Sequence, residues 1–144
     1  MDLTALAARE AIRELIARYA HLVDRGRIDE LLALFAPDGT LEANDLLPAR
    51  GHAEIRAFLT GAGTRLAAAS RSALVRHHVS SVSIELTGPA TATTSSYFFV
   101  VTEHGPDHWG RYRDTLVQRE DHWLFHHRRV RTDGHAPGSV FGRG

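Results

Sequence analysis

His77 is the residue whose type and position best suit acid–base chemistry. It lies in the segment 75–86, where apolar and polar residues alternate as in a strand with one buried face. The alternation changes parity midway, so a β-bulge at Ser80–Ser81 is needed to keep the apolar residues together. An imidazole on such a face is either an active-site base or a half-buried histidine held by a backbone carbonyl. With the bulge, His77 shares its face with Val75, Val79, Val82, Ile84 and Leu86.

Asp24 is the second candidate, because a carboxylate at its position needs a partner. It falls in the last turn of the first predicted helix, where the helix macrodipole disfavours negative charge. The ordinary explanation is a solvated ion pair with Arg25 or Arg27, worth at most about 1 kcal/mol. The alternative is an inward side chain that orients and charges His77. The pattern of residues leaves both explanations open.

Ten histidines are many for this length, and some of them resemble metal ligands. The neighbours His77–His78 and His126–His127 lie in predicted strands, where adjacent side chains point to opposite faces and cannot chelate together. His104 and His108 are four residues apart, but Gly105–Pro106 between them argues against a helical pair. Neither His-x-His nor Glu-x-x-His spacing occurs, so we expect no metal site.

The bulk composition fits one domain. The chain has 144 residues, and its 17 basic and 17 acidic side chains give no net charge and no bias towards nucleic acid. It has no cysteine, which excludes disulfides and thiolate chemistry and suits a reducing compartment. No long apolar run or signal peptide is present, so we expect a cytoplasmic protein without a membrane partner. We expect a single domain at 1–133 and a flexible tail at 134–144.

The first half of the chain predicts three helices. Thr4 is expected to cap the first helix, and Gly26 can take the left-handed conformation that follows its last turn. A short second helix carries an apolar stripe that ends at Phe35. Pro37–Gly39 should stop this helix and form a turn, and a short strand is expected at 40–43.

The third helix should begin at Gly51, after a loop. Gly61–Gly63 is expected to interrupt it, because glycine weakens a helix interior. Within the segment 60–74, residues 64–72 are rich in alanine and serine. Its pattern is compatible with a helical continuation or with a mobile flap that closes a cavity.

The second half predicts consecutive strands joined by turns. Helices followed by hairpin-linked strands indicate an α+β fold, in which a curved, cone-shaped antiparallel sheet packs on three N-terminal helices. Strong curvature would leave a cavity between sheet and helices. The strands are expected at 75–86, 90–102, 108–119 and 123–131, with a loop at 104–107 and a tight turn at Glu120–Asp121.

This order of elements resembles the nuclear transport factor 2-like superfamily. Within it, the chain is similar to the SnoaL-like branch that contains scytalone dehydratase and hexachlorocyclohexane dehydrochlorinase. The resemblance extends from about Ala8 to Asp133. It is carried by residues 11–19, 23–24, 29–37, Gly51 with Ile55, 77–85, 110–114 and 123–130.

The resemblance implies roles for several residues. In the dehydratase and dehydrochlorinase members, an aspartate at the end of the first helix pairs with a histidine general base, and Asp24 and His77 match these positions. Tyr19 matches a tyrosine of a bile-acid dehydratase of similar fold, which would polarise a carbonyl or protonate a leaving hydroxyl. Its alternative is a core aromatic. Arg128 matches an arginine of the dehydrochlorinase, which would stabilise negative charge. Its alternative is a surface cation.

Further residues are expected to bind the substrate. We assign Phe35, Tyr112 and Tyr97 to the substrate-binding set, although Tyr112 and Asp114 also suit a cross-strand packing pair. The chain departs from scytalone dehydratase, because Val23 and Ala43 replace its tyrosines and the strand around 97–102 lacks its second histidine. Scytalone itself is therefore not the expected substrate.

The combined prediction is a cofactor-free lyase of the dehydratase type that acts on a small, hydrophobic, oxygenated or cyclic substrate. The first alternative is a polyketide cyclase or a ketosteroid-isomerase-like isomerase. The second is a non-catalytic ligand-binding or dimerisation module, in which Asp24 and His77 would lie apart or Phe98, Phe99 and Trp109 would fill the cone. The resemblance also implies a homodimer or homotrimer.

Overall fold

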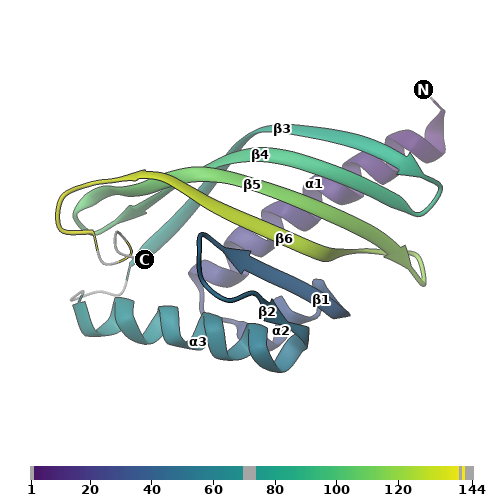
Figure 1. The fold of residues 1–144 in the computed structure, drawn as a ribbon. Coiled ribbons are helices and arrows are strands. Elements are labelled where there is room, and N and C mark those ends of the chain that lie inside the picture. Colours follow the sequence, from purple (N-terminus) through teal and green to yellow (C-terminus); the bar gives the residue numbers. More distant parts are fainter. Residues whose placement is uncertain (1, 70–73, 140, 142–144) are drawn as a thin grey trace.

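The computed structural model describes residues 2–69, 74–139 and 141. It contains three helices and a six-stranded sheet (Figure 1). The helices are α1 (Leu3–Asp24), α2 (Ile28–Leu32) and α3 (Gly51–Ala69). The strands are β1 (Phe35–Ala43), β2 (Ala49–Arg50), β3 (Val75–Gly88), β4 (Thr91–Thr102), β5 (Gly105–Arg119) and β6 (His122–His135).

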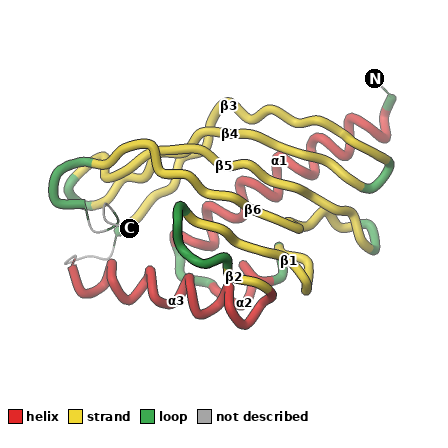
Figure 2. Tube along the Cα trace, viewed as in Figure 1, coloured by secondary structure: helices red, strands yellow, loops and turns green. Residues whose placement is uncertain are grey.

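The strands form one curved sheet in the order β2-β1-β6-β5-β4-β3 (Figure 2). Strands β3 to β6 form an antiparallel meander, and β1 joins it by pairing in parallel with β6. α1 crosses behind the sheet, whereas α3 runs beside β1 and β2. The α+β prediction of a curved sheet packed on N-terminal helices is therefore confirmed.

The first helix ends where its sequence predicts, although its cap differs. The side chain of Asp2, not Thr4, caps the N-terminus by accepting a hydrogen bond from the backbone N–H of Ala5 at 2.7 Å. Gly26 has a φ of +66° and reverses the chain after the helix. The buried stripe of α1 consists of Ile12, Leu15, Ile16, Tyr19, Ala20 and Leu22, which hold the helix against the sheet.

Two predictions in the first half are wrong. Phe35 begins β1 instead of ending a helix, and Pro37–Gly39 belongs to the same strand, where the pairing with β6 shifts register between Phe35 and Thr40. α3 continues through Gly61–Gly63 to Ala69. Its helical hydrogen bonds outweigh the low helix propensity of two glycines. Residues 70–73 of the predicted flap lie outside the described residues.

The predicted bulge in β3 is confirmed. The pairing of β3 with β4 shifts register between Ser80 and Ser83, and Ser81 has a φ of +54°. The residues predicted to share a face alternate with exposed ones on both sides of the bulge. The inserted residue thus keeps His77 on the same face as the later apolar side chains.

The last two strands are longer than predicted. β5 begins at Gly105, inside the expected loop, and β6 extends to His135, past the expected end at Arg131. The turn at Glu120–Asp121 forms as predicted, and both residues have positive φ. β5 and β6 approach closely at Gly110, where a Cβ added to the glycine would lie 1.9 Å from the carbonyl oxygen of Arg131.

Two apolar clusters lie between the sheet and the helices. The larger one joins α1, α2, α3 and the sheet, and includes Ile12, Leu31, Phe35, Ile55, Leu116 and Phe125. The smaller one contains Leu66, Val75, Phe98, Val100 and Tyr112, with Phe141 packed against it. Among the described residues, no helix is both long and apolar enough to cross a membrane.

Candidate active site

Asp24 and His77 are in direct contact. The last residue of α1 places a carboxylate against β3, and its Oδ1 lies 2.6 Å from Nδ1 of His77. The same carboxylate accepts the backbone N–H of His77, at 3.1 Å to Oδ1 and 3.0 Å to Oδ2. Asp24 therefore holds both the strand and the ring of His77, which explains a carboxylate at the unfavourable end of the helix.

This contact determines which ring nitrogen of His77 is free to act. A carboxylate only accepts hydrogen bonds, so Nδ1 carries the proton that it donates to Asp24. Nε2 then holds the lone pair and can accept a proton from a bound molecule. If His77 becomes protonated, the adjacent carboxylate stabilises the imidazolium. The pair thus has the chemistry of an oriented general base.

The pair sits in an apolar, partly shielded environment. The side chains of Asp24 and His77 are only 10% and 15% exposed. Val75 and Val79, two residues on either side of His77 along the same strand face, both pack in the smaller apolar cluster. Restricted water strengthens the electrostatic interaction between the carboxylate and the ring.

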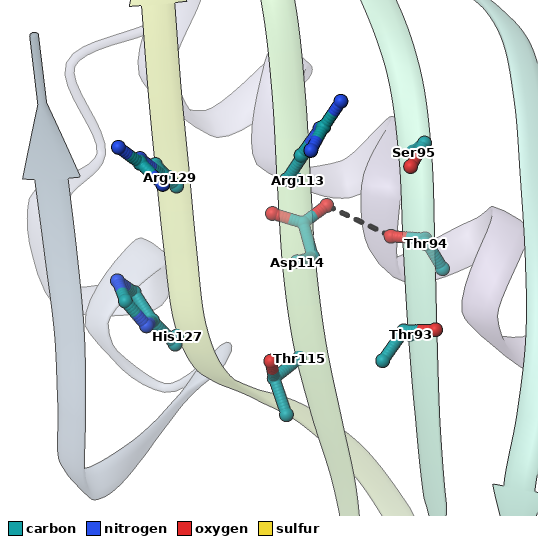
Figure 3. Close-up of a pocket in the computed structure, with 8 residues that line it drawn as sticks. All are labelled: Thr93, Thr94, Ser95, Arg113, Asp114, Thr115, His127 and Arg129. Carbon is teal, nitrogen blue, oxygen red and sulfur yellow. Dashed lines mark hydrogen bonds between the residues drawn. The ribbon is translucent and has the colours of Figure 1, made fainter.

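The side chain of Arg128 is on the buried face of the sheet and not at the protein surface. It is fully buried and donates from Nε and Nη2 to Asp114, at 2.9 and 3.1 Å. Asp114 also accepts a hydrogen bond from Oγ1 of Thr94 at 3.0 Å, which Figure 3 shows. Burial alone would lower the pKa of Arg128, but the ion pair with Asp114 raises it, so the guanidinium stays charged. Its Nη1 has no hydrogen-bond partner.

Tyr19 and Tyr112 pack against this guanidinium. The Cζ atom of Arg128 lies 4.2 Å from the ring centre of Tyr19 and 3.8 Å from that of Tyr112, at cation–π distance. Burial raises the pKa of both phenols, although the charge of Arg128 opposes the shift. Both rings therefore remain neutral hydrogen-bond donors over the physiological range. Tyr19 also packs edge-on against Phe35 and Phe125 in the larger cluster.

Two predicted substrate-binding residues do not join the Asp24–His77 pair. Phe35 is 1% exposed within the larger cluster. Tyr97 is 58% exposed, because β4 buries the alternate residues Ser96 and Phe98 and turns Tyr97 to the outer face of the sheet. Phe99 and Trp109, which the binding-module alternative placed inside the cone, are also exposed on that outer face.

Sequence reasoning missed several polar residues on the inner face. Thr94 and Ser96 alternate with exposed residues of β4 and are buried, and Oγ of Ser96 has no hydrogen-bond partner. Asp107 and His108 form a second carboxylate–imidazole pair, with Nδ1 of His108 2.7 Å from Oδ2 of Asp107. Their adjacency in the sequence is the available signal, but the predicted boundary between the loop at 104–107 and the strand at 108–119 separates them.

A pocket of about 300 Å³ opens elsewhere on the sheet (Figure 3). It is lined mainly by exposed alternate residues of β4 and β5 and by two half-buried residues of β6, so it faces away from the Asp24–His77 pair. These residues are Thr93, Ser95, Arg113, Thr115, His127 and Arg129. In the described part of the chain, no group of three or more histidine, aspartate or glutamate side chains could hold a metal ion.

One known protein family covers most of the chain. The family model of the SnoaL-like domain matches residues 4–129, which contain both members of the pair and most of the sheet. The chain belongs to the SnoaL-like domain family. Its fold is that of the nuclear transport factor 2-like superfamily. No curated protein matches the chain.

Solved structures resemble this SnoaL-like domain over nearly its whole length. A candidate scytalone dehydratase from Novosphingobium aromaticivorans DSM 12444 is 27% identical with a TM-score of 0.79, and the match covers 100% of this chain and 99% of the other. An NTF2-like protein with a cystatin-like fold from the same genus and species is 28% identical with a TM-score of 0.76, covering 99% and 98%. A protein of unknown function from Nostoc punctiforme PCC 73102 is 28% identical with a TM-score of 0.78, covering 96% and 98%.

Proposed function

We propose that this SnoaL-like domain is a cofactor-free lyase of the dehydratase type. The 2.6 Å contact between Asp24 and His77 carries the proposal, because it leaves one basic nitrogen oriented in an apolar, partly shielded place. The substrate would be a small, hydrophobic, oxygenated or cyclic molecule with an acidic C–H next to a carbonyl. The similarity to a candidate scytalone dehydratase supports this choice of reaction.

In the proposed reaction, Nε2 of His77 removes the proton from the carbon next to the carbonyl. The electron pair of that C–H bond forms the enolate and then the new C=C bond, while the C–O bond to the β-hydroxyl breaks. The proton taken by His77 returns to the departing hydroxide, which leaves as water. Asp24 holds the ring in the required tautomer and stabilises the imidazolium between the two steps.

Tyr19 and Arg128 have supporting roles in this proposal. Tyr19 remains a neutral phenol and could donate a hydrogen bond to the enolate oxygen. Nη1 of Arg128 is buried without a partner, and so it is available to the same oxygen or to a neighbouring group. The ring of Tyr112 also packs against the guanidinium, with its centre 3.8 Å from Cζ of Arg128.

The test is turnover of a panel of cyclic β-hydroxy ketones. We expect His77→Gln to lower kcat by about 10²–10⁴-fold, the usual contribution of a positioned general base. Asp24→Asn should also lower kcat, but by less. His104→Gln is the matched control, because its side chain is 80% exposed. Turnover that His77→Gln leaves unchanged would remove the proposal. A greater loss in Asp24→Asn than in His77→Gln would instead favour the cyclase alternative.

We also propose that the chain forms a homodimer or homotrimer through the outer face of its sheet. His78, Phe99 and Trp109 are partners in adjacent strands and therefore form a row across this face. The rings of His78 and Phe99 stack with centres 4.6 Å apart. Tyr97 lies beside this row. Large apolar side chains gathered on one face favour association.

A further inference from the structure

The second carboxylate–imidazole pair lies on the same side of the sheet as the first. His77 of β3 is the partner of Val100 in β4, and Val100 is the partner of His108 in β5. Directly opposed residues of antiparallel strands point to the same face. Since Val100 is fully buried, all three side chains face the interior. His77 and His108 are thus two strands apart, about 10 Å between their Cα atoms.

A bulge in β5 creates the second pair. Val101 pairs with Pro106 and Val100 with His108, so Asp107 is an extra residue without its own partner in β4. The bulge lets adjacent side chains meet, which a regular strand would send to opposite faces. The result is the 2.7 Å contact between Oδ2 of Asp107 and Nδ1 of His108.

Asp107 is held firmly in this position. Its Oδ2 also accepts a hydrogen bond from Oγ of Ser139 at 2.5 Å, and its backbone oxygen accepts one from the N–H of Ala136 at 2.7 Å. The ring of Phe141 lies 5.3 Å from that of His108. Contacts from the segment after β6 therefore help to hold the pair in place.

His108 keeps one ring nitrogen free to act as a hydrogen-bond acceptor. Asp107 accepts from Nδ1–H, so Nε2 holds the lone pair, as it does in His77. Burial lowers the pKa of His108 despite the adjacent carboxylate, and the nearby His77 and His135 lower it further, so the ring stays neutral. Val100 lies between the two histidines, and the ring of Phe98 packs edge-on against that of His108, so the surface beside them is apolar.

We infer that His108 is a substrate-binding residue that accepts a hydrogen bond from a second hydroxyl group of the molecule attacked by His77. The arrangement rests on the proposed function and specifies its substrate. Two acceptor nitrogens at the ends of an apolar strip fit a flat, hydroxylated, one- or two-ring ketone. The acidic C–H would lie at His77, and a phenolic or alcoholic hydroxyl at the far end would lie at His108.

The experiment compares two matched substrates in three proteins. The substrates are a bicyclic β-hydroxy ketone with a distal phenol and its methyl ether. The proteins are wild type, His108→Phe and the control His104→Phe, which alters an exposed histidine. Phenylalanine keeps the ring volume of His108 but removes the acceptor. We expect His108→Phe to raise KM for the phenol by about tenfold or more, to leave kcat nearly unchanged and to leave the methyl ether unaffected.

Asp107→Asn tests whether His108 acts through its acceptor nitrogen. If the pair were merely structural, the variant would not change the preference between the two substrates. The amide of asparagine can donate to Nδ1 of His108, which transfers the ring proton to Nε2 and turns the acceptor into a donor. The variant should therefore lose its preference for the phenol over the methyl ether.

A second test uses the wild-type protein. Nitrogen-15 NMR of the imidazoles should show Nε2 of His108 shifting with a phenolic ketone that lacks the leaving hydroxyl, and not with its ether.

The outcomes separate this inference from the proposed function. Equal losses on both substrates, or no loss on either, together with an unshifted Nε2 signal, would overturn the role of His108. The proposed function would survive that result if His77→Gln still abolished turnover. If His77→Gln retains full turnover, the lyase proposal fails. The role of His108 is then decided by the NMR experiment alone, in which a shift of its Nε2 signal shows that it binds the phenolic hydroxyl.

Discussion

Single residues in this domain derive their chemistry from the partner that each one meets. Asp24 accepts a hydrogen bond from Nδ1 of His77, and Asp107 accepts one from Nδ1 of His108. Asp114 accepts hydrogen bonds from two guanidinium nitrogens of Arg128. The first two contacts leave a basic nitrogen available. The third neutralises a charge that would otherwise be isolated in the core. Three carboxylates on the same side of the sheet thus have different effects. Two of them orient an imidazole, and the third neutralises a buried guanidinium.

The buried ion pair allows a prediction at this scale. Arg128→Met leaves the carboxylate of Asp114 buried with only Thr94 as its hydrogen-bond donor. We expect the free energy of unfolding in urea to fall by about 3–5 kcal/mol, because a buried charge loses its partner. The double variant Arg128→Met/Asp114→Leu should recover much of this loss. If the double variant is as unstable as the single one, the cost is due to lost packing with the aromatic rings instead.

At the scale of elements, irregular positions in the strands decide what faces the interior. The Ser80–Ser81 bulge keeps the apolar face of β3 continuous, and the bulge at Asp107 brings two adjacent side chains together. The first was predictable, because the alternation of apolar residues changes parity in the sequence. The second was not, because Gly105 and Pro106 are typical of a loop and conceal the start of β5.

The bulge in β3 can be tested with a pair of matched variants. Ser81 has a φ of +54°, a region that β-branched side chains avoid. Ser81→Val should therefore reduce the free energy of unfolding by roughly 1–2 kcal/mol. Ser83→Val, at another exposed position of the same strand, should change it by less than about 0.5 kcal/mol. Equal stability of the two variants would show that the bulge imposes no such constraint.

The continuity of α3 gives a prediction of the opposite sign. Gly61 lies inside the helix, and no atom would lie within 4 Å of an added Cβ. Gly61→Ala should raise the free energy of unfolding by about 0.5–1 kcal/mol, because alanine has the higher helix propensity. Gly26→Ala is the contrasting control, since its φ of +66° makes alanine unfavourable. A loss of stability in Gly61→Ala would indicate that the helix is interrupted there.

At the scale of the whole molecule, the general architecture could be predicted more fully than the details of the site. The periodicity of the helices and strands indicates an α+β fold. Two unusual positions make Asp24 and His77 candidates, and only the resemblance to the SnoaL-like branch pairs them. The buried Arg128–Asp114 pair was not predicted, since alternation on β5 and β6 suits either packing or a pocket and does not show that the two side chains meet. Tyr97 was wrongly predicted to face the interior. The run Tyr97–Val101 is apolar on both faces, so its sequence does not show which residues point inward.

The outer face provides the prediction on association. Phe99 and Trp109 are 43% and 42% exposed and lie next to each other in β4 and β5. Light scattering after size exclusion should give the mass of a dimer or trimer for wild type, and that of a monomer for Phe99→Asp/Trp109→Asp. Arg56→Asp, on the exposed surface of α3, is the charge-changing control and should keep the wild-type mass. A monomeric wild type would contradict the proposed association.

The interior of the molecule should respond to alkaline pH through its two buried phenols. Burial raises the pKa of Tyr19 and Tyr112 above the value of 10 that they have in the unfolded chain. Their contribution to stability is complete below pH 10. It is lost as pH rises from 10 towards the folded-state values, because the unfolded chain then releases protons that the folded chain keeps.

Each phenol should lower the free energy of unfolding by about 1.4 kcal/mol per pH unit in that range. Urea unfolding at pH 9, 10 and 11 measures the slope. Tyr112→Phe should remove about half of it, whereas Tyr97→Phe, at an exposed ring, should leave it intact. A slope that is the same in Tyr112→Phe and Tyr97→Phe would mean that water reaches the phenol of Tyr112.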